Sequence, residues 1–313
     1  MQIYLPIAEI PVNILLILSL GLLTGILAGI FGIGGGFLAT PLLMFIGISP
    51  AIAVATSANQ ITASSISGLL PHLKKGCVDI RMGLILLIGG MIGSFIGVAI
   101  FSMLQNIGQI DLAVSLIYVL FLGTIGFLMF ADSLKIILKN KFNIVFGKNR
   151  KRKIGFIARL SRKSAKLPLK IHFPKSEIRI SIFVPLLLGL IVGTLVSIMG
   201  IGGGFIMIPV MVYILRMPSN VIVGTSLFQI SFIAANVTFL QSYSNHNVDV
   251  VLAALMIFSS VIGAQIGTRL GYKIDANSLR SLLSLMILAV CIKMLIGLFS
   301  EPINLYNIEL LKR

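Results

Sequence analysis

Apolar residues recur along this chain in blocks of roughly 20, the length of helix that crosses the hydrocarbon core of a bilayer. Hydrophobic residues make up 57% of the 313 residues, and charged residues make up only 11%. A soluble domain of this length cannot hide so much apolar surface. The blocks also lack the short alternation of a transmembrane β-barrel. The sequence therefore predicts an all-α polytopic membrane protein.

A glycine-rich cluster occurs twice with nearly the same text. GIFGIGGGFLATP occupies 29–41, and SIMGIGGGFIMIP occupies 197–209. Further along, ATSANQI at 55–61 matches GTSLFQI at 224–230, and the offset between the copies drifts only from 168 to 170. Because the matches stay in order over most of each half, the sequence predicts an internal duplication.

The duplication divides the chain into three parts. We predict a first transmembrane repeat at 1–134, a basic linker at 135–179 and a second transmembrane repeat at 180–313. Each repeat holds five apolar helical segments, and in both repeats the second segment is short and follows the glycines. The ten segments lie at 12–33, 37–48, 50–70, 82–101 and 112–134, and at 180–199, 205–215, 219–241, 250–270 and 279–299.

Basic residues in equivalent loops predict that the two repeats are inverted in the membrane. The loop 71–81 has three Lys or Arg residues, whereas its counterpart 242–249 has none. The loop 102–111 has none, whereas its counterpart 271–280 has two. Since positive loops stay on the cytoplasmic side, equivalent loops lie on opposite sides. An odd number of crossings in each half produces this result and places both termini outside.

The net charge of +16 is concentrated in the linker. Fifteen Lys and Arg residues lie between Lys135 and Arg179 against one acid, Glu177. This distribution indicates a cytoplasmic loop of a multi-pass protein of the cell membrane, and it does not suggest a nucleic-acid-binding surface. Anionic lipid is a candidate partner of the linker.

Charge counting leaves one alternative open. The segment 37–48 has 12 residues, which is about 18 Å of helix and too short for a hydrocarbon core of about 30 Å. The first two segments of a repeat either both cross the membrane or both dip in and return as a re-entrant hairpin. With either choice, each half crosses the membrane an odd number of times.

The glycine clusters predict broken helices that form a binding site. Broken backbone survives at membrane depth only where protein or a water-filled cavity covers it. The helix that follows begins with free N–H groups and the positive end of its dipole, and glycine lets a ligand approach the main chain. Such a helix start binds anions without a charged side chain, and paired breaks are typical of secondary transporters.

Hydroxyl and amide side chains lie where such a site needs donors. In each copy a Thr-Ser pair is followed by a Gln, and the Thr and Gln are four residues apart on one helix face. We therefore predict a substrate-binding set made of Gly34, Gly35, Gly36, Thr56, Ser57 and Gln60 from the first repeat and Gly202, Gly203, Gly204, Thr225, Ser226 and Gln229 from the second. The alternative for the Thr, Ser and Gln residues is helix–helix hydrogen bonding.

Other kinds of site are not indicated. The glycine spacing does not fit a dinucleotide fingerprint, and the histidines and cysteines lack metal-ligand spacing, so we predict no catalytic residue, no metal and no cofactor. Asp79 and Asp249 stand before helical segments as expected N-caps. Lys293 lies inside a span, where its ammonium group either attracts an anion or extends to the membrane–water interface.

The doubled GxGGGF…P cluster, followed by Pro and then by TS…Q, resembles the TauE/SafE family of sulfite exporters. The resemblance covers both halves and leaves out the linker. It implies a carrier of sulfur oxyanions or organosulfonates in the cytoplasmic membrane, with some relatives carrying other small organic anions. In the first copy Ala55 stands where the second copy has Gly224.

These observations together predict a secondary transporter of small anions, such as sulfite or an organosulfonate, that works by alternating access and is not an enzyme. The alternatives are a carrier of another organic anion, such as a carboxylate, and a non-transporting membrane scaffold that uses the linker.

Overall fold

A computed structural model describes residues 2–142, 170–176, 178–215, 217–271 and 276–299, and the described chain is almost entirely helical. The elements of the first half are β1 Gln2–Tyr4, β2 Pro11–Asn13, α1 Ile14–Phe31, α2 Gly36–Phe45, α3 Pro50–Lys74, α4 Ile80–Asn106 and α5 Ile110–Phe142. Those of the second half are β3 Lys170–Phe173, β4 Ile178–Ser181, α7 Phe183–Met199, α8 Gly204–Pro209, the π-helix η1 Val210–Leu215, α9 Ser219–Asn245, α10 Val250–Gly271 and α11 Ala276–Phe299.

Six stretches of helix among the described residues are long and apolar enough to cross a membrane. They are Ile14–Phe31, Ile80–Asn106, Ile110–Phe127, Val221–Asn245, Val250–Gly271 and Ser281–Phe299. Helix α3 is not among them because its interior is rich in Ser and Thr, yet most of that polar face is buried inside the bundle. The predicted class, an all-α polytopic membrane protein, is confirmed.

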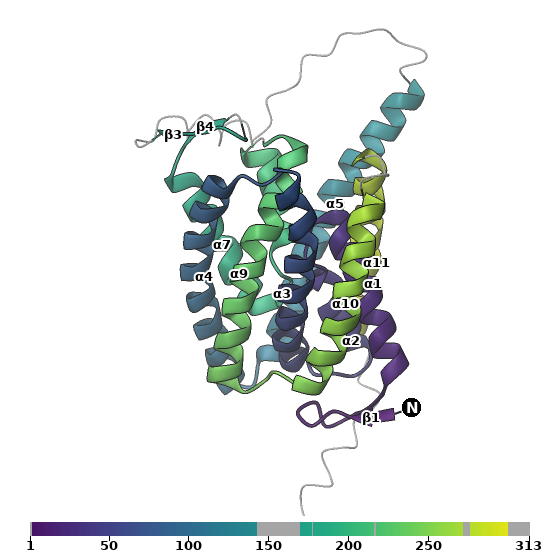
Figure 1. Cartoon of the computed structure of the whole chain (residues 1–313). Helices are drawn as coiled ribbons and strands as arrows, with labels where there is room; N and C mark the ends of the chain where they lie inside the picture. Colours follow the sequence, from purple (N-terminus) through teal and green to yellow (C-terminus); the bar gives the residue numbers. More distant parts are fainter. Residues whose placement is uncertain (1, 143–169, 177, 216, 272–275, 300–313) are drawn as a thin grey trace, which may run out of the picture.

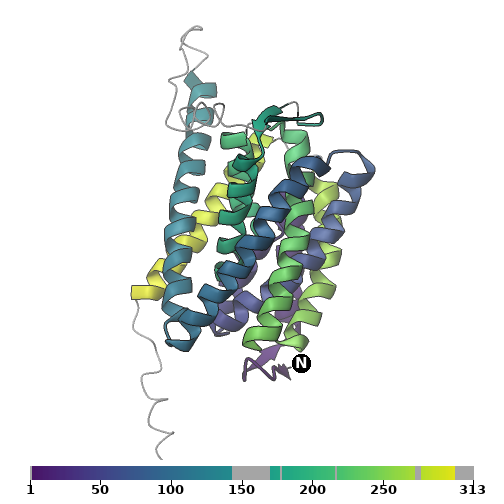
Figure 2. The same cartoon turned by 90° about the vertical axis from the view of Figure 1, so that its left-hand side faces the viewer.

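The helices pack as equivalent pairs around a central contact between α3 and α9. Helix α1 packs along α10, and α7 packs along α4, while α5 and α11 pair on one side of the bundle (Figures 1 and 2). Glycines permit the two long contacts, because small residues let helix backbones approach closely. A Cβ at Gly25 would lie 2.3 Å from the Ser260 carbonyl oxygen, and one at Gly93 would lie 2.1 Å from the Leu190 carbonyl oxygen.

Helices α1 and α2 form a hairpin within the bundle. One buried cluster joins Ile17 at the start of α1, Leu43 near the end of α2, Ala53 at the start of α3 and Leu252 at the start of α10. The end of α2 therefore lies at the same end of the bundle as the start of α1. Both alternatives that the charges leave open, two crossings or a re-entrant hairpin, return the chain to this end, so the choice between them stays open, although α1 alone is long and apolar enough to cross a membrane.

Two β-hairpins precede the two halves, and neither was predicted. Strands β1 and β2 pair Gln2 with Asn13, and β3 and β4 pair Lys170 with Ser181, so both registers differ by the repeat offset of 168. The hairpins lie at opposite ends of the bundle (Figure 1), which we call the β1–β2 end and the β3–β4 end. The second hairpin begins in the predicted linker and ends at Ser181, in the predicted second repeat, and 143–169 fall outside the described residues. The inversion of the repeats relative to a membrane remains a prediction.

Asp79 and Asp249 cap helices, as expected, and also join the halves. The Asp79 carboxylate accepts from the Met82 N–H at 3.1 Å and from the Ser176 hydroxyl of the β3–β4 hairpin. The Asp249 carboxylate accepts from the Leu252 N–H at 3.0 Å. It also accepts from the N–H groups of Ile7 and Ala8 in the β1–β2 hairpin, at 3.0 and 3.3 Å. Each aspartate thus fixes the hairpin of the other half.

Replacing Asp249 by Ala should lower the free energy of unfolding by about 1–2 kcal/mol, because the variant loses a helix cap and leaves two hairpin N–H groups without an acceptor. Thermal unfolding in detergent, followed by size-exclusion chromatography, measures the change. Gln109→Ala, at an exposed loop position, is the control and should be neutral. Equal melting temperatures for the two variants would argue against the cap.

Candidate substrate site

The two glycine clusters form two breaks in the helices, as predicted. Helix α1 ends at Gly32, and α2 begins after the N-cap Gly35, which has φ 75°. Helix α7 ends at Gly200, and α8 begins after the N-cap Gly203, which has φ 65°. Only glycine adopts this left-handed conformation without a steric penalty. We call 32–36 and 200–204 the first and second break.

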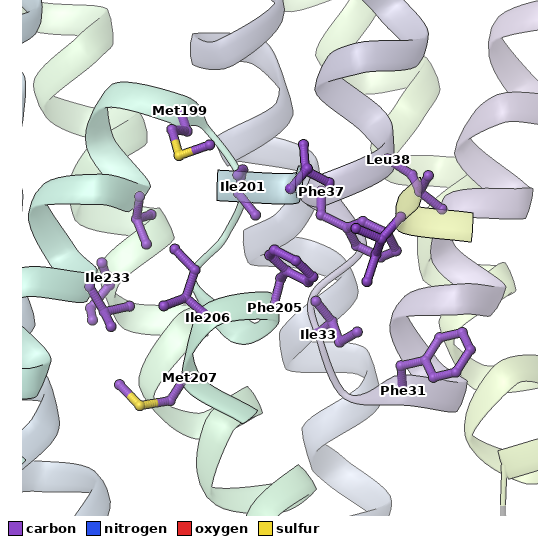
Figure 3. Packing of buried hydrophobic residues seen from close by; sticks show 14 of the residues in the cluster. Phe31, Ile33, Phe37, Leu38, Met199, Ile201, Phe205, Ile206, Met207 and Ile233 are labelled. Carbon is purple, nitrogen blue, oxygen red and sulfur yellow. The ribbon is translucent and has the colours of Figure 1, made fainter. Parts of the chain in front are cut away.

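The breaks cross each other at contact distance in the centre of the bundle. A Cβ on Gly36 would lie 2.8 Å from the Ile201 carbonyl carbon, and a Cβ on Gly204 would lie 2.5 Å from the Ile33 oxygen. The rings of Phe37 and Phe205, which follow the last glycine of each break, stack with centroids 5.5 Å apart (Figure 3). No side chain larger than hydrogen fits at Gly36 or Gly204 without moving the other break.

Hydroxyl groups of other helices hold the carbonyl groups of both breaks. Ser226 on α9 donates to the Gly32 oxygen at 3.0 Å, and Ser64 on α3 donates to the Gly34 oxygen at 3.1 Å. Thr40 on α2 lies 3.3 Å from the Gly200 oxygen. These bonds satisfy carbonyl groups that the interrupted helices leave without an intrahelical partner.

Four of the predicted side-chain ligands have structural partners in this conformation. The hydroxyl oxygens of Thr56 and Thr225 accept from the backbone N–H groups of Asp249 and Asp79, at 3.2 and 3.0 Å. Ser57 donates to a carbonyl of its own helix and lies 2.9 Å from the Thr40 hydroxyl. Together with the bond of Ser226 to the first break, these contacts are the helix–helix hydrogen bonding that the sequence left as the alternative.

The two predicted glutamines differ from the other polar residues of the site. Gln60 and Gln229 are fully buried. Among the described residues, the Gln60 Oε1 atom and both polar atoms of the Gln229 amide have no hydrogen-bond partner. The same holds for the buried Ser65 hydroxyl, whose oxygen lies 2.9 Å from where a Cβ on Gly34 would be. An unpaired buried amide costs about 1–3 kcal/mol, so these three residues are the strongest candidates for ligand contacts. The sequence analysis named the glutamines and missed Ser65.

The surroundings of the breaks are polar in the first half and apolar in the second. Thr24, Thr40, Ser64 and Ser65 lie near the first break or on the helices beside it. At the equivalent positions of the second copy stand Val192, Ile208, Ile233 and Ala234. The two copies therefore differ in polarity at these four positions.

No charged side chain among the described residues is buried at the crossing. The buried carboxylates of the described chain are those of Asp79 and Asp249, at helix starts. Lys293 is exposed, with its Nζ atom 4.1 Å from the centre of the Phe45 ring, and it takes no part in the crossing. The described residues also contain no cluster of three metal-ligating side chains. A ligand at the crossing would meet neutral groups.

The fold and the crossing define a multi-pass membrane protein with paired broken helices, the architecture of many secondary transporters. A family model described as "Sulfite exporter TauE/SafE" matches residues 17–294. The chain belongs to this family and is a membrane transporter.

Relatives from distant organisms carry similar descriptions. The "Probable membrane transporter protein YunE" of Bacillus subtilis (strain 168) is 27% identical, over 92% of this chain and 100% of the relative. A "Probable membrane transporter protein" of Xylella fastidiosa (strain 9a5c) is 26% identical, over 90% and 94%. "Sulfite exporter TauE/SafE family protein 1" of Arabidopsis thaliana is 34% identical, over 28% of this chain and 20% of the relative. No solved structure matches the chain significantly.

Gly35 and Gly108 provide a matched test of the crossing. Their φ angles are 75° and 74°, but a Cβ on Gly35 would lie 2.6 Å from the Thr24 oxygen, whereas one on Gly108 would meet nothing within 4 Å. Gly108→Ala should cost about 1–2 kcal/mol of backbone strain. Gly35→Ala should cost about 1–3 kcal/mol more through the clash. Thermal unfolding measures both, and equal losses would show that the backbone at the crossing is not closely packed.

Proposed function

We propose that this membrane transporter carries small anions, in the first place sulfite or another sulfur oxyanion or organosulfonate. The observation that supports the proposal most directly is the unpaired, fully buried amide of Gln229 beside two broken helices. The family description, which names sulfite, agrees with it. A carboxylate is the alternative substrate class.

The anion would be held without a fixed positive charge. In the proposal, backbone N–H groups of Gly34, Gly35 and Gly36 at the start of α2 face the anion, helped by the positive end of the α2 dipole. The equivalent break contributes the N–H groups of Gly202 and Gly203, and that of Gly204 would have to leave the Gly202 oxygen, to which it donates at 2.7 Å in this conformation. The Gln229 amide and the Ser65 hydroxyl group supply side-chain donors, and the Gln60 amide lines the site with its unpaired Oε1 atom. Neutral donors bind an oxyanion less tightly than a lysine or arginine would, which suits a carrier that must release its substrate.

The four hydroxyl residues of the predicted set would not touch the anion but would hold the helices that carry the ligands. They are Thr56, Ser57, Thr225 and Ser226. Their hydroxyl groups are bonded to loops or breaks in the present conformation. They would keep α3 and α9 in register with the breaks, so that the two glutamines stay at the crossing.

Transport would follow from relative movement of the two halves, 1–134 and 180–313, about the crossing. The Asp249 contacts hold the β1–β2 end, and the Asp79 contacts hold the β3–β4 end. Opening one end while the other stays closed would give alternating access. In the proposed topology the linker 135–179 is cytoplasmic, where anionic lipid is its candidate partner, and both termini lie outside.

The experiment is flux into liposomes that contain the purified protein. We expect saturable uptake of sulfite that an unlabelled substrate on the opposite side accelerates, and we expect sulfate, thiosulfate, taurine and a carboxylate to compete to different extents. Flux that never saturates would indicate a channel. Absence of flux for the whole panel would overturn the proposal.

Replacing Gln229 by Leu should lower sulfite flux without lowering the stability of the protein. Because the Gln229 amide has no partner, its removal should raise the free energy of unfolding by about 1 kcal/mol while sulfite flux falls at least about tenfold, the loss of one good hydrogen bond. Thermal unfolding and liposome flux are measured on the same preparation.

Gln241→Leu is the control for Gln229→Leu on the same helix. Gln241 donates to the Ser197 oxygen and accepts from Asn245, so this variant should lose stability instead. A Gln229→Leu protein that is destabilised, or that transports at the full rate, would contradict the assignment of Gln229.

A further inference from the structure

The Thr24 hydroxyl group determines how the Gln60 amide is oriented. Thr24 Oγ1 lies 2.8 Å from the Leu20 carbonyl oxygen and 3.1 Å from that of Gly21, and it donates its proton to them. The Thr24 oxygen can then only accept from Gln60, and it does so from the Gln60 Nε2 atom at 2.9 Å. The Gln60 Oε1 atom is left as the unpartnered atom. Thr24 therefore takes one of the two Gln60 N–H groups, and Oε1 is left as a buried acceptor that needs a donor from a ligand.

Other hydroxyl groups near the crossing also use their protons on carbonyl groups. Ser57 donates to Ala53, Ser64 to Gly34 and Ser226 to Gly32. Each can offer a ligand only its lone pairs in this conformation. The lining is therefore richer in acceptors than its residue types suggest.

A fully ionised oxyanion has no hydrogen to donate, so it cannot satisfy the Gln60 Oε1 atom. Placing one lone pair against another in a buried site leaves the acceptor unpaired and adds repulsion between negative partial charges. An oxyanion that keeps one proton removes both penalties, because its O–H group donates to Oε1 while its other oxygens accept. The donors for those oxygens are the Gln229 amide, the Ser65 hydroxyl group and the N–H groups of the breaks.

We propose that the site selects the monoprotonated form of its oxyanion, such as hydrogensulfite, and that Thr24 is the positioning residue that imposes this selection. The inference rests on the proposed function, since it concerns the same site. One proton then travels with each anion, stays covalently attached to it and is not transferred to a protein group. This explains how transport could respond to pH without a buried carboxylate at the crossing.

The second half lacks this arrangement. Val192 stands at the position equivalent to Thr24, and its side chain lies 3.1 Å from where a Cβ on Gly203 would be. With no hydroxyl group from Val192, the Gln229 amide has no partner to fix its orientation. Gln229 can therefore turn its NH₂ group towards the anion, whereas the bond to Thr24 holds the Gln60 amide with its Oε1 atom unpaired.

Titratable groups on the elements packed against α3 do not contact the Gln60 amide. Among the described side chains only the Tyr118 hydroxyl approaches the crossing, where it donates to the Met199 oxygen at 2.7 Å. The others lie towards helix ends and are Asp111 on α5, Tyr243 on α9, Asp249 and Arg269 beside or on α10, and His72 and Lys74 on α3. Sulfate, which stays a dianion across neutral pH, reports any titration of these groups.

The test is equilibrium binding of sulfite and of sulfate to the purified protein across the pH range in which hydrogensulfite loses its proton. If only the monoprotonated form binds, the apparent affinity for total sulfite falls about tenfold per pH unit above the pKa of hydrogensulfite, as linkage to one proton requires. Sulfate should bind weakly at every pH. Affinity for sulfite that is constant or rises with pH would overturn the inference, as would sulfate binding as tightly as sulfite. If neither anion binds at any pH, the proposed function itself fails.

Two substitutions that exchange the residue types of the two copies sharpen the test. Thr24→Val releases the Gln60 amide, which can then present its NH₂ group, so the pH dependence of sulfite affinity should flatten and sulfate affinity should rise. Val192→Thr should restrain Gln229 and steepen the discrimination against sulfate. Thr124→Val is the matched control. Thr124 makes the same bonds to its own helix, at 2.8 and 3.1 Å, but is exposed. A Thr24→Val protein with the pH profile of the Thr124→Val control would refute the role of Thr24.

Discussion

The close crossing of two glycine-rich breaks is the constraint on which this structure depends. Main chain meets main chain at Gly36 and Gly204, and a single added methyl group at either position would push the breaks apart. Because the crossing interrupts helices inside the bundle, carbonyl groups lose their intrahelical partners there, and α3 and α9 must supply hydroxyl groups to replace them. The breaks thus account for part of the polar interior of α3, through Ser64.

Repetition within the sequence made much of this fold predictable. The glycine clusters predicted where the helices break, and the apolar blocks predicted every helix to within a few residues, except for the extension of α5 and the division between α8 and η1. The hairpins were missed because strands of three or four residues are too short to show an apolar period. A signal was nevertheless present, since QIYLPIAEI at 2–10 and KIHFPKSEI at 170–178 match at the repeat offset.

The candidate site was predictable in position but not in detail. The residue types suggested that hydroxyl donors line the site. A sequence alone, however, does not show to which acceptor each hydroxyl group donates. In the structure Ser57 and Ser226 donate to backbone carbonyl groups, and Thr56 and Thr225 accept from backbone N–H groups. The buried polar atoms without a partner among the described residues belong to Gln60, Gln229 and Ser65. Differences between the copies, such as Thr24 against Val192, become meaningful only once these partners are known.

The most direct measurement is a crystal structure of the protein with selenite, an analogue of sulfite whose selenium atom scatters anomalously. The account predicts one anomalous peak between the breaks, with oxygen atoms within hydrogen-bond distance of the Gln229 and Gln60 amides. A protein that transports sulfite and yet binds selenite only elsewhere, with no peak at the crossing, would contradict the account.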